Sequence, residues 1–325
     1  MAPALGVDLA AGDGSDWTLG IAVADYNNDG HVDLYVANDY NGPNGVGLDP
    51  GNNVLYRNNG DGTFTDVSVE SGADDAGWAM GVAFGDYDGD GHMDIFLANF
   101  WEDSLLRNKG DGTFENVTRD VGIITDAEDE WHYNGWGTSF FDFDNDGDMD
   151  IHVANGYILN DQGQVVNEPN QLWENKGLGQ NGHVEFVDMA KKAGVDDRGD
   201  GRGAAYGDFN RDGLIDMMVI NNGFLAGEGI IESPQRLLYV NRGNGTFEDR
   251  GFLYGLRKKM QDESPPGGYR DYTGNAWVQI KTIAPETATP INRSGIGSRV
   301  EVTVDDKTMI QDVGAASYAS TSSPF

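Results

Sequence analysis

The chain has 325 residues, no cysteine, and 54 acidic against 21 basic residues, which gives a formal net charge of −33. This length allows one large or two ordinary domains, and the lack of cysteine excludes disulfides and thiolate chemistry. So acidic a surface repels nucleic acids and anionic membranes but suits cations, so we expect no nucleic-acid partner.

The first predicted strands flank the stretch DYNNDGHVD at 25–33, and this pattern returns along the chain at intervals of about sixty residues. The later copies are DYDGDGHMD at 86–94, DFDNDGDMD at 142–150 and DFNRDGLID at 208–216. A glycine stands five residues before the first Asp of every copy, and an apolar run ending in Asn follows the last Asp. This regularity predicts repeated structural units.

Each copy predicts a loop that wraps oxygen atoms around a hard cation. Positions 1, 3, 5 and 9 carry Asp or Asn, position 6 is a glycine at a sharp turn, and position 7 offers its backbone carbonyl. We therefore expect about four Ca²⁺ ions, one for each loop. The predicted metal-site residues are Asp25, Asn27, Asp29, His31, Asp33, Asp86, Asp88, Asp90, His92, Asp94, Asp142, Asp144, Asp146, Asp148, Asp150, Asp208, Asn210, Asp212, Leu214 and Asp216.

The loop pattern has two alternative interpretations, an EF-hand and a turn without metal. An EF-hand needs a Glu at position 12 and flanking helices, whereas position 12 here is Val36, Leu97, Val153 or Val219 inside an apolar run of strand length. An Asx-rich turn without metal is the second alternative, because Asp, Asn and Gly favour turns in any case. The position-7 imidazoles of His31 and His92 are expected to point to solvent.

The segments around each loop predict a four-stranded antiparallel unit. One strand precedes the loop and one follows it, a third strand such as VLYRN at 54–58 comes next, and a turn such as NGDGTF at 59–64 leads into the fourth. Repeated four-stranded units are typical of a β-propeller, so the predicted fold is all-β. The apolar runs do not alternate cleanly, which predicts strands buried on both faces. The Asp-rich loops and the Asp-Gly turns should then share one face of the disc.

The repeats resemble the FG-GAP/VCBS proteins, a family of calcium-loop β-propellers that includes the heads of integrin α-chains. The resemblance covers roughly residues 15–251 and rests on the ligand spacing, the preceding glycine and the closing GTF. It implies that each loop binds Ca²⁺. Family propellers often have seven blades, so four repeats predict a piece of a longer protein.

The C-terminal part is predicted to form a separate small β domain. Residues 1–251 form the propeller repeats, 252–274 are a linker rich in Pro, Gly and charge, and 275–325 resemble an incomplete ASPIC/UnbV domain of the cartilage acidic protein family and its bacterial relatives. The residues that carry this second resemblance are Asn275, Trp277, Asn292, Arg293, Gly295, Gly297, Arg299 and Val300.

The face opposite the loops carries the variable connections, at 39–52, 100–103, 156–170 and 222–235, together with the aromatic and acidic segment EDEWHYNGW at 128–136. Loops on a rigid scaffold are the usual place for recognition. The partner-binding residues are predicted to be Tyr40, Trp101, Trp131, His132 and Tyr157. The alternative is that these aromatic side chains only pack between blades.

Two classes of function remain open. The first is a calcium-stabilised extracellular, cell-surface or periplasmic module for binding or adhesion, with a glycan or protein partner and no insertion into a membrane. The second is a natural-product biosynthetic or carbohydrate-active enzyme on the same disc. The sequence shows no recognisable catalytic constellation, which favours the first class. The integrin-type tripeptide at Arg198, Gly199 and Asp200 is interpreted as a chance match.

Overall fold

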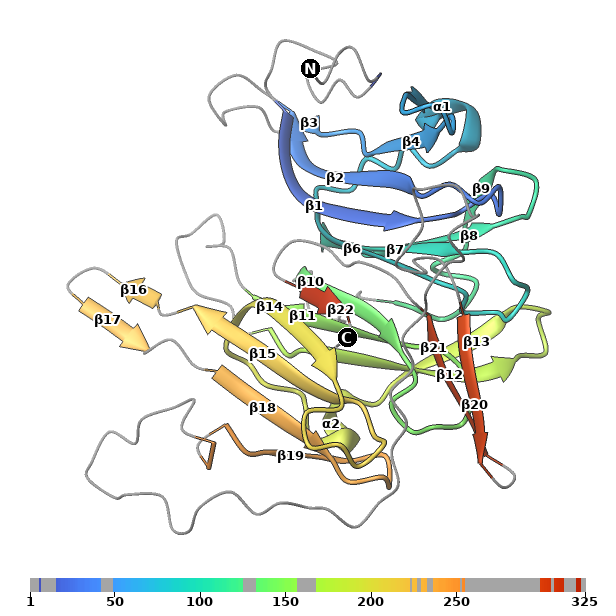
Figure 1. The fold of residues 1–325 in the computed structure, drawn as a ribbon. Helices are drawn as coiled ribbons and strands as arrows, with labels where there is room; N and C mark the ends of the chain where they lie inside the picture. Colours follow the sequence, from blue (N-terminus) through green and yellow to red (C-terminus); the bar gives the residue numbers. More distant parts are fainter. Residues whose placement is uncertain are drawn as a thin grey trace.

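The computed structural model describes most of the propeller repeats and parts of the C-terminal segment. The described residues are 6, 16–41, 49–124, 133–156, 168–222, 224–226, 229–232, 236–251, 253–254, 299–304, 307–312 and 320–322. They form antiparallel sheets that follow one another in an arc, with two short helices beside them (Figure 1). The fold is therefore all-β, as the sequence predicts.

Each repeat forms one blade, and its four strands pair in chain order. Blade 1 consists of β1 (Asp16–Ala24), β2 (Asp33–Asn41), β4 (Val54–Asn58) and β5 (Phe64–Asp66), with the two-residue β3 (Asp49–Pro50) beside β2. Blade 2 consists of β6 (Ala79–Gly85), β7 (Asp94–Trp101), β8 (Ser104–Asn108) and β9 (Phe114–Asn116). The predicted unit of four antiparallel strands is confirmed in both blades.

Blades 3 and 4 repeat this order. Blade 3 consists of β10 (Tyr133–Phe141), β11 (Asp150–Asn155), β12 (Gln171–Leu178) and β13 (Val184–Asp188). Blade 4 consists of β14 (Asp200–Gly207), β15 (Asp216–Asn222), β18 (Arg236–Asn241) and β19 (Phe247–Asp249). A small hairpin of β16 (Phe224–Ala226) and β17 (Gly229–Glu232) lies in the connection between β15 and β18.

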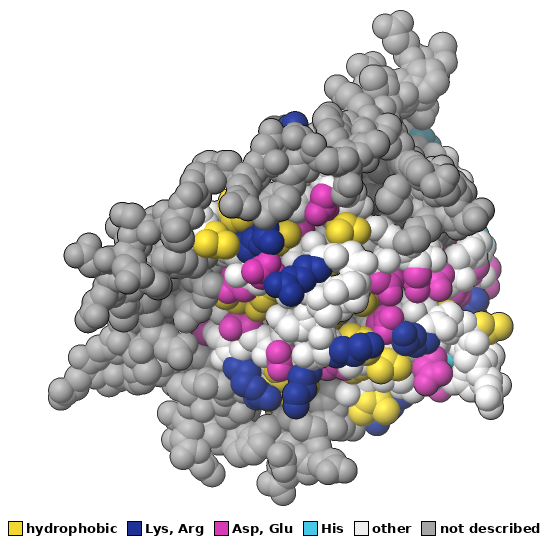
Figure 2. All heavy atoms as spheres, turned by 90° about the horizontal axis from the view of Figure 1, so that it is seen from below, with side chains coloured by type: hydrophobic (Ala, Val, Ile, Leu, Met, Phe, Trp, Pro, Cys, Tyr) yellow, Lys and Arg dark blue, Asp and Glu magenta, His cyan; other side chains and the backbone are white. Residues whose placement is uncertain are grey.

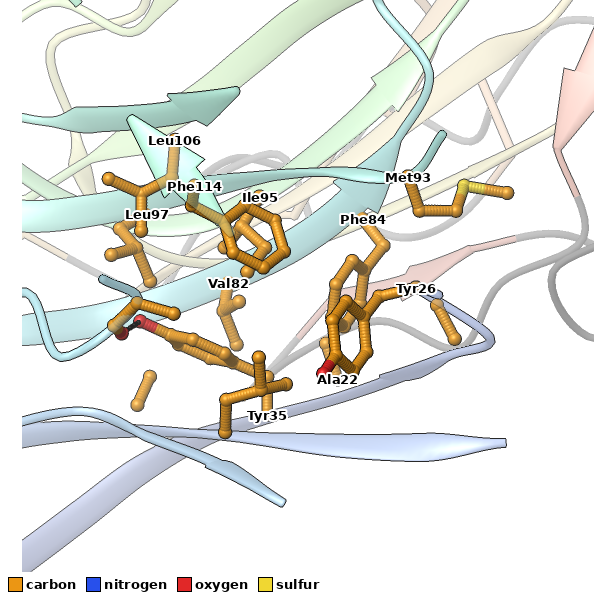
Figure 3. Packing of buried hydrophobic residues seen from close by; sticks show 14 of the residues in the cluster. Ala22, Tyr26, Tyr35, Val82, Phe84, Met93, Ile95, Leu97, Leu106 and Phe114 are labelled. Atoms are coloured by element: carbon orange, nitrogen blue, oxygen red, sulfur yellow. Dashed lines mark hydrogen bonds between the residues drawn. The ribbon is translucent and has the colours of Figure 1, made fainter. Parts of the chain in front are cut away.

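The hydrophobic core lies between consecutive blades. One buried cluster joins blades 1 and 2, a second joins blades 2 and 3, and a third joins blades 3 and 4. Figure 3 shows the first cluster, in which Tyr35 of blade 1 meets the edge of Phe84 of blade 2 with ring centroids 6.3 Å apart. The strand β6 is buried along its whole length, so the prediction of strands covered on both faces is confirmed there.

The recurring glycine of blades 2 and 3 lies where the first strands of adjacent blades come close together. A Cβ atom on Gly81 of β6 would stand 1.8 Å from the carbonyl oxygen of Trp136 in β10. A Cβ atom on Gly137 of β10 would stand 2.6 Å from the backbone nitrogen of Ala204 in β14. Any side chain there would push neighbouring blades apart, which explains why the pattern contains glycine.

Two short helices follow the fourth strands of blades 1 and 3. They are α1 (Ser68–Ser71) and α2 (Ala190–Ala193), and each ends at a glycine in the left-handed conformation, Gly72 or Gly194. The segment TFTDVS at 63–68 predicts a fourth strand that runs to Ser68, and this prediction is wrong. The strand ends at Asp66, because the Asp66 carboxylate accepts the Ser68 backbone N–H at 3.0 Å and turns the chain into the helix.

Three further strand pairings lie outside the predicted four-stranded units. The end of β10 pairs with the end of β7, with Tyr133 opposite Trp101, and this joins blades 2 and 3 into one continuous sheet. In the C-terminal segment, β20 (Arg299–Val304) and β21 (Lys307–Asp312) form a hairpin, and β22 (Ser320–Ser322) pairs in parallel with β14. The division into a propeller, a linker and a small domain stays a prediction, since 255–298 lie outside the described residues.

Candidate metal loops and the opposite face

Each Asp-rich loop folds around the carboxylate at its first position. In loop 1, the residues 25–33, Asp25 accepts the backbone N–H of Asp29 at 3.0 Å on one oxygen and that of Gly30 at 2.8 Å on the other. Asp142 in loop 3 (142–150) and Asp208 in loop 4 (208–216) accept the same pair of N–H groups. In loop 2 (86–94), the backbone N–H of Gly91 donates to the Asp86 carboxylate at 3.0 Å. These bonds turn each loop back on itself and gather its carboxylates on the inside.

The carboxylates at position 9 are the most deeply buried members of the loops. Asp33, Asp94, Asp150 and Asp216 each have 0% of their surface exposed. One oxygen of each accepts the backbone N–H of loop position 2 at 3.0–3.2 Å, and the other accepts the N–H of an Asn at 2.8 Å. These bonds fix the carboxylates in place in all four loops.

Burial makes the ionised form of these acids costly. It raises the pKa of Asp33 and of Asp216 to about 7, and it raises the pKa of Asp94 and Asp150 well above the ordinary value. Burial also raises the pKa of Asp142, at position 1 of loop 3, to about 7. A bound cation is the physical partner that would keep such a group of buried acids ionised at neutral pH.

The first, third and fifth positions converge in loops 2 and 3. Single carboxylate oxygens from Asp86, Asp88 and Asp90 lie within 4.8 Å of one another, and so do those from Asp142, Asp144 and Asp146. Both groups could hold a metal ion. Loops 1 and 4 differ because their third position is Asn27 or Asn210, whose amide donates to the fifth-position Asp at 2.9 Å. All these donors are oxygen atoms, the kind that Ca²⁺ and Mg²⁺ prefer.

The imidazole rings of His31 and His92, at position 7 of loops 1 and 2, pack against glycines of a neighbouring turn. The ring of His31 lies so close to Gly60 that a Cβ atom there would stand 2.5 Å from the imidazole, and His92 lies over Gly110 in the same way. Both glycines belong to the turn between the third and fourth strands and have positive φ. The expectation of solvent-directed imidazoles is therefore wrong. The same contacts confirm that the Asp-rich loops and the Asp-Gly turns share one face.

An asparagine at the end of each third strand connects neighbouring loops. The amide of Asn108 donates to the carbonyl of Met93 at position 8 of its own loop, at 3.0 Å, and to that of Tyr26 at position 2 of the preceding loop, at 2.8 Å. Asn175 and Asn241 make the corresponding pairs of bonds. We call Asn108, Asn175 and Asn241 the latch asparagines. Their counterpart in blade 1, Asn58, makes the bond to its own loop, with Val32.

The opposite face carries a cluster of three aromatic side chains from blade 2. Trp78 meets Trp101 edge to face at a ring-centroid distance of 4.9 Å, and both rings contact Phe100. Trp101 is 45% exposed. Since β7 runs from Asp94 in loop 2 to Trp101, the cluster lies at the end of the blade away from the loops.

The predicted partner-binding residues are described only in part. Trp101 lies on the predicted face, and the backbone of Tyr40 lies in β2, opposite Pro50 of β3. Trp131, His132 and Tyr157 lie outside the described residues. The tripeptide at 198–200 does not present its acid to solvent, because Asp200 is buried and forms an ion pair with Arg202.

The sequence pattern did not indicate several residues that the structure places at these two faces. In the sequence, each latch asparagine is only the last residue of a run such as QLWEN at 171–175, which gives no sign of a contact with another blade. The carboxylate of Asp103, two residues after Trp101, is buried at the end of blade 2 away from the loops and accepts the Asn99 backbone N–H at 3.0 Å. A recurring Asn after the third strand is the signal that could have revealed the latch.

Part of the chain matches a known repeat family in sequence. The family described as FG-GAP-like repeat matches residues 45–97 and 86–153, which run from the connection after β2 into β11. This part of the chain carries FG-GAP-like repeats. The matched residues include loops 2 and 3, the two loops with converging carboxylates.

The FG-GAP-like chain is also similar to cartilage acidic protein 1, which supports the resemblance noted in the sequence. The protein from Xenopus tropicalis is 29% identical over 243 residues, which are 71% of this chain and 34% of the frog protein. The mouse and human proteins are each 30% identical over 215 residues, 62% of this chain and 31% or 30% of theirs. The chain thus spans about a third of the length of the curated relatives it matches.

One solved structure matches the chain at low similarity. Its title describes specific recognition of non-reducing terminal N-acetylglucosamine by an Agrocybe aegerita lectin. It aligns with the FG-GAP-like chain with a TM-score of 0.38 at 20% identity, over 72% of this chain and 51% of that one. At this distance the likeness carries no inference about a ligand. In the described part of the chain, no helix is long and apolar enough to cross a membrane.

Proposed function

We propose that this chain is a calcium-stabilised binding module of an extracellular protein, which recognises a glycan or a protein through the face opposite its Asp-rich loops. The observation that carries the proposal is the set of position-9 carboxylates, fully buried in all four repeats. Buried acids in a regular oxygen-lined loop are stable as anions when a cation shares the loop.

The residues that would hold the ions are the side chains at positions 1, 3, 5 and 9 and the carbonyl at position 7 of each loop. The donor set fits a hard cation, because it contains no sulfur and its His residues pack over glycines instead of facing the carboxylates. The bound ion would supply positive charge that cancels the repulsion among the acids. Extracellular modules bind Ca²⁺ at ~10⁻⁴–10⁻³ M, which suits the medium outside cells.

Thermal unfolding in the presence of Ca²⁺ and of EDTA tests the calcium role. We expect Ca²⁺ at 100 times its dissociation constant to stabilise the native state by about 2.7 kcal/mol per site, because it binds the folded loops only. Asp88→Ala should lose part of this gain, since Asp88 belongs to the converging group in loop 2.

Asp111→Ala is the matched control for that measurement. Asp111 is an exposed acid on the same face, but it bonds only within its own turn, to Thr113. This variant should keep the full response to Ca²⁺. An unfolding midpoint of the unaltered protein that is the same in Ca²⁺ and EDTA would count against a structural role of calcium.

The aromatic cluster of Trp78, Phe100 and Trp101 supports the assignment of the partner face. An exposed ring held by two others is a preformed surface for stacking on a sugar or packing on a protein side chain. Trp78 and Trp101 both have positive φ, at 52° and 84°, which is a costly conformation for bulky residues. Such backbone strain is often found where a ligand is held.

A glycan-array or pull-down experiment tests this face. Trp101→Ala should reduce binding at least tenfold, because removing a central aromatic anchor typically costs more than ~2 kcal/mol. Leu178→Ala is the control, since Leu178 is also exposed but lies at the end of β12 on the loop face. Equal binding by both variants would show that the partner binds at a different surface from the one around Trp101.

A further inference from the structure

The residue just before the asparagine at the end of each third strand differs in charge from blade to blade. It is Arg57, Arg107, Glu174 and Val240 in blades 1 to 4. The next residue along the chain, the asparagine, bonds to the position-9 carboxylate of its own loop through its backbone N–H at 2.8 Å in all four blades. The variable residue is therefore tied to the loop at a fixed register, and we call it the flanking residue.

In loop 2 the flanking residue reaches two of the converging acids. Arg107 donates through Nε to Asp88 at 2.7 Å, and its Nη2 lies 3.5 Å from Asp90. Its Nη1 lies 3.6 Å from Glu115 on β9, which helps to hold the guanidinium beside the loop. Asp88 and Asp90 are at positions 3 and 5. The guanidinium of Arg107 therefore lies beside two of the four side chains that would bind the ion in loop 2.

In loop 3 the flanking residue has the opposite sign. Glu174 is buried, and the next residue, Asn175, donates its backbone N–H to Asp150 of loop 3 at 2.8 Å. The Glu174 carboxylate lies close enough to Asp144 at position 3 for the two like charges to interact. Lys176 lies 2.6 Å from Glu174, but its side chain is 44% exposed, so solvent weakens the charge that it sets against Glu174.

We propose that the flanking residue sets the calcium affinity of its loop, so that loop 3, with Glu174, fills at lower Ca²⁺ concentration than loop 2, with Arg107. This inference rests on the proposed calcium binding of the loops. Affinity in oxygen-lined loops is tuned by the number of charged ligands. Arg107 subtracts one charge from the four carboxylates of loop 2, whereas Glu174 adds one to the carboxylates of loop 3, which has four at positions 1, 3, 5 and 9 and a fifth, Asp148, at position 7.

The expected change in Ca²⁺ affinity follows from the short distance between the flanking charge and the loop. A unit charge within about 6 Å of a bound ion changes its binding by at least tenfold, even at the high effective dielectric of a protein surface. We therefore expect Arg107→Met to lower the half-saturating Ca²⁺ concentration of loop 2 about tenfold. Glu174→Gln should raise that of loop 3 by a similar factor. Arg107→Lys retains the charge and should leave loop 2 within about twofold of its original value.

The position-6 glycines allow each loop to be followed separately. The backbone N–H groups of Gly91 and Gly147 donate to the first-position Asp of loops 2 and 3, so their amide signals will report filling of those loops. The experiment titrates Ca²⁺ into the whole chain labelled with [¹⁵N]glycine and records ¹H–¹⁵N spectra. Arg119→Met and Glu102→Gln are matched controls, since this exposed ion pair makes the same charge changes at the far end of blade 2.

The expected result is a Gly147 midpoint below the Gly91 midpoint, with each variant moving only the glycine of its own loop. If the Gly91 midpoint stays the same or rises in Arg107→Met while the protein remains folded, the inference is overturned, and Arg107 has a structural role. If the control variants shift the midpoints equally, net charge explains the effect and the inference fails. If no glycine signal responds to Ca²⁺ in the unaltered chain, the proposed calcium binding fails as well, which is a distinct outcome.

Discussion

The fourth position of each Asp-rich loop needs a left-handed backbone. Its φ is 57° at Asn28, 58° at Asn145, 62° at Arg211 and 72° at Gly89. Asn and Gly adopt this conformation with little strain, whereas other residues pay for contacts between Cβ and the backbone. Loop 4 thus carries an unfavourable residue at a position where the other three loops carry favourable ones.

Arg211→Asn should therefore stabilise the protein by about 0.5–1 kcal/mol, because it relieves that strain without changing the loop geometry. Urea unfolding with Ca²⁺ present measures the change. Arg211→Ala is the control, since it removes the guanidinium but keeps a residue that resists positive φ. A gain as large in the alanine variant would assign the effect to the lost charge instead of the backbone.

At the scale of strands and loops, the latch asparagines explain how neighbouring blades keep their register. Each one ties the first half of one loop to the end of the next loop through a pair of backbone carbonyl groups. Buried carbonyl groups that lose a donor cost about 1–3 kcal/mol each. The latch therefore couples the docking of blades to the shape of the loops.

Asn108→Ala should destabilise the protein by about 2–4 kcal/mol, because two buried carbonyl groups, of Tyr26 and Met93, lose their donor. Asn58→Ala provides a matched comparison in the same sequence context. Its amide donates to Val32 in its own loop, so we expect about half of that loss. Equal losses measured by chemical unfolding would mean that the bond between blades contributes nothing.

At the scale of the whole molecule, negative charge dominates but is not spread evenly. Figure 2 shows Lys and Arg side chains interspersed with acidic ones on the face seen from below. In the described residues, six of the ten buried acids belong to the four loops, namely Asp33, Asp86, Asp94, Asp142, Asp150 and Asp216, and the other four are Asp103, Glu168, Glu174 and Asp200. The stability of the molecule should therefore depend on pH, and bound calcium should reduce this dependence.

Without calcium, the free energy of unfolding should fall as pH rises from 6.5 to 8. The pKa of Asp33, Asp142 and Asp216 is about 7 in the folded protein, above the ordinary value of 3.8. In this range the folded state holds more protons than the unfolded state, so raising the pH removes stability. Guanidinium unfolding in EDTA at several pH values measures the slope.

With Ca²⁺ bound, the loop acids are ionised in the folded state, so the slope should become smaller. The part that remains belongs to Asp103 and Glu168, buried acids outside the loops whose pKa is also raised to about 7. The range above pH 6.5 also avoids the buried His152, whose pKa burial lowers to about 3 and which destabilises the fold only at lower pH. An identical pH dependence with and without Ca²⁺ would show that the loops are not the titrating groups.

The sequence by itself determined the features that are local. The ligand spacing, the glycine turn and the strand-length apolar runs lie within a few residues of one another, so the loops, the four-stranded blades and their shared face could be predicted from residues such as Asp88 and Gly91. Short-range turn chemistry and burial of apolar runs are enough to specify them. The exceptions were also local: Asp66 ends its strand because its carboxylate turns the chain into α1.

Only the tertiary structure decided what lies between blades. Asn108, Asn175 and Asn241 find carbonyl partners 82, 88 and 98 residues away, and no periodicity encodes which carbonyl group will face them. The pairing of Trp101 with Tyr133, the stacking of His92 over Gly110 and the burial of Asp200 beside Arg202 have the same origin. Each depends on how whole blades pack, because close packing of the shared core fixes which polar groups meet at its edges.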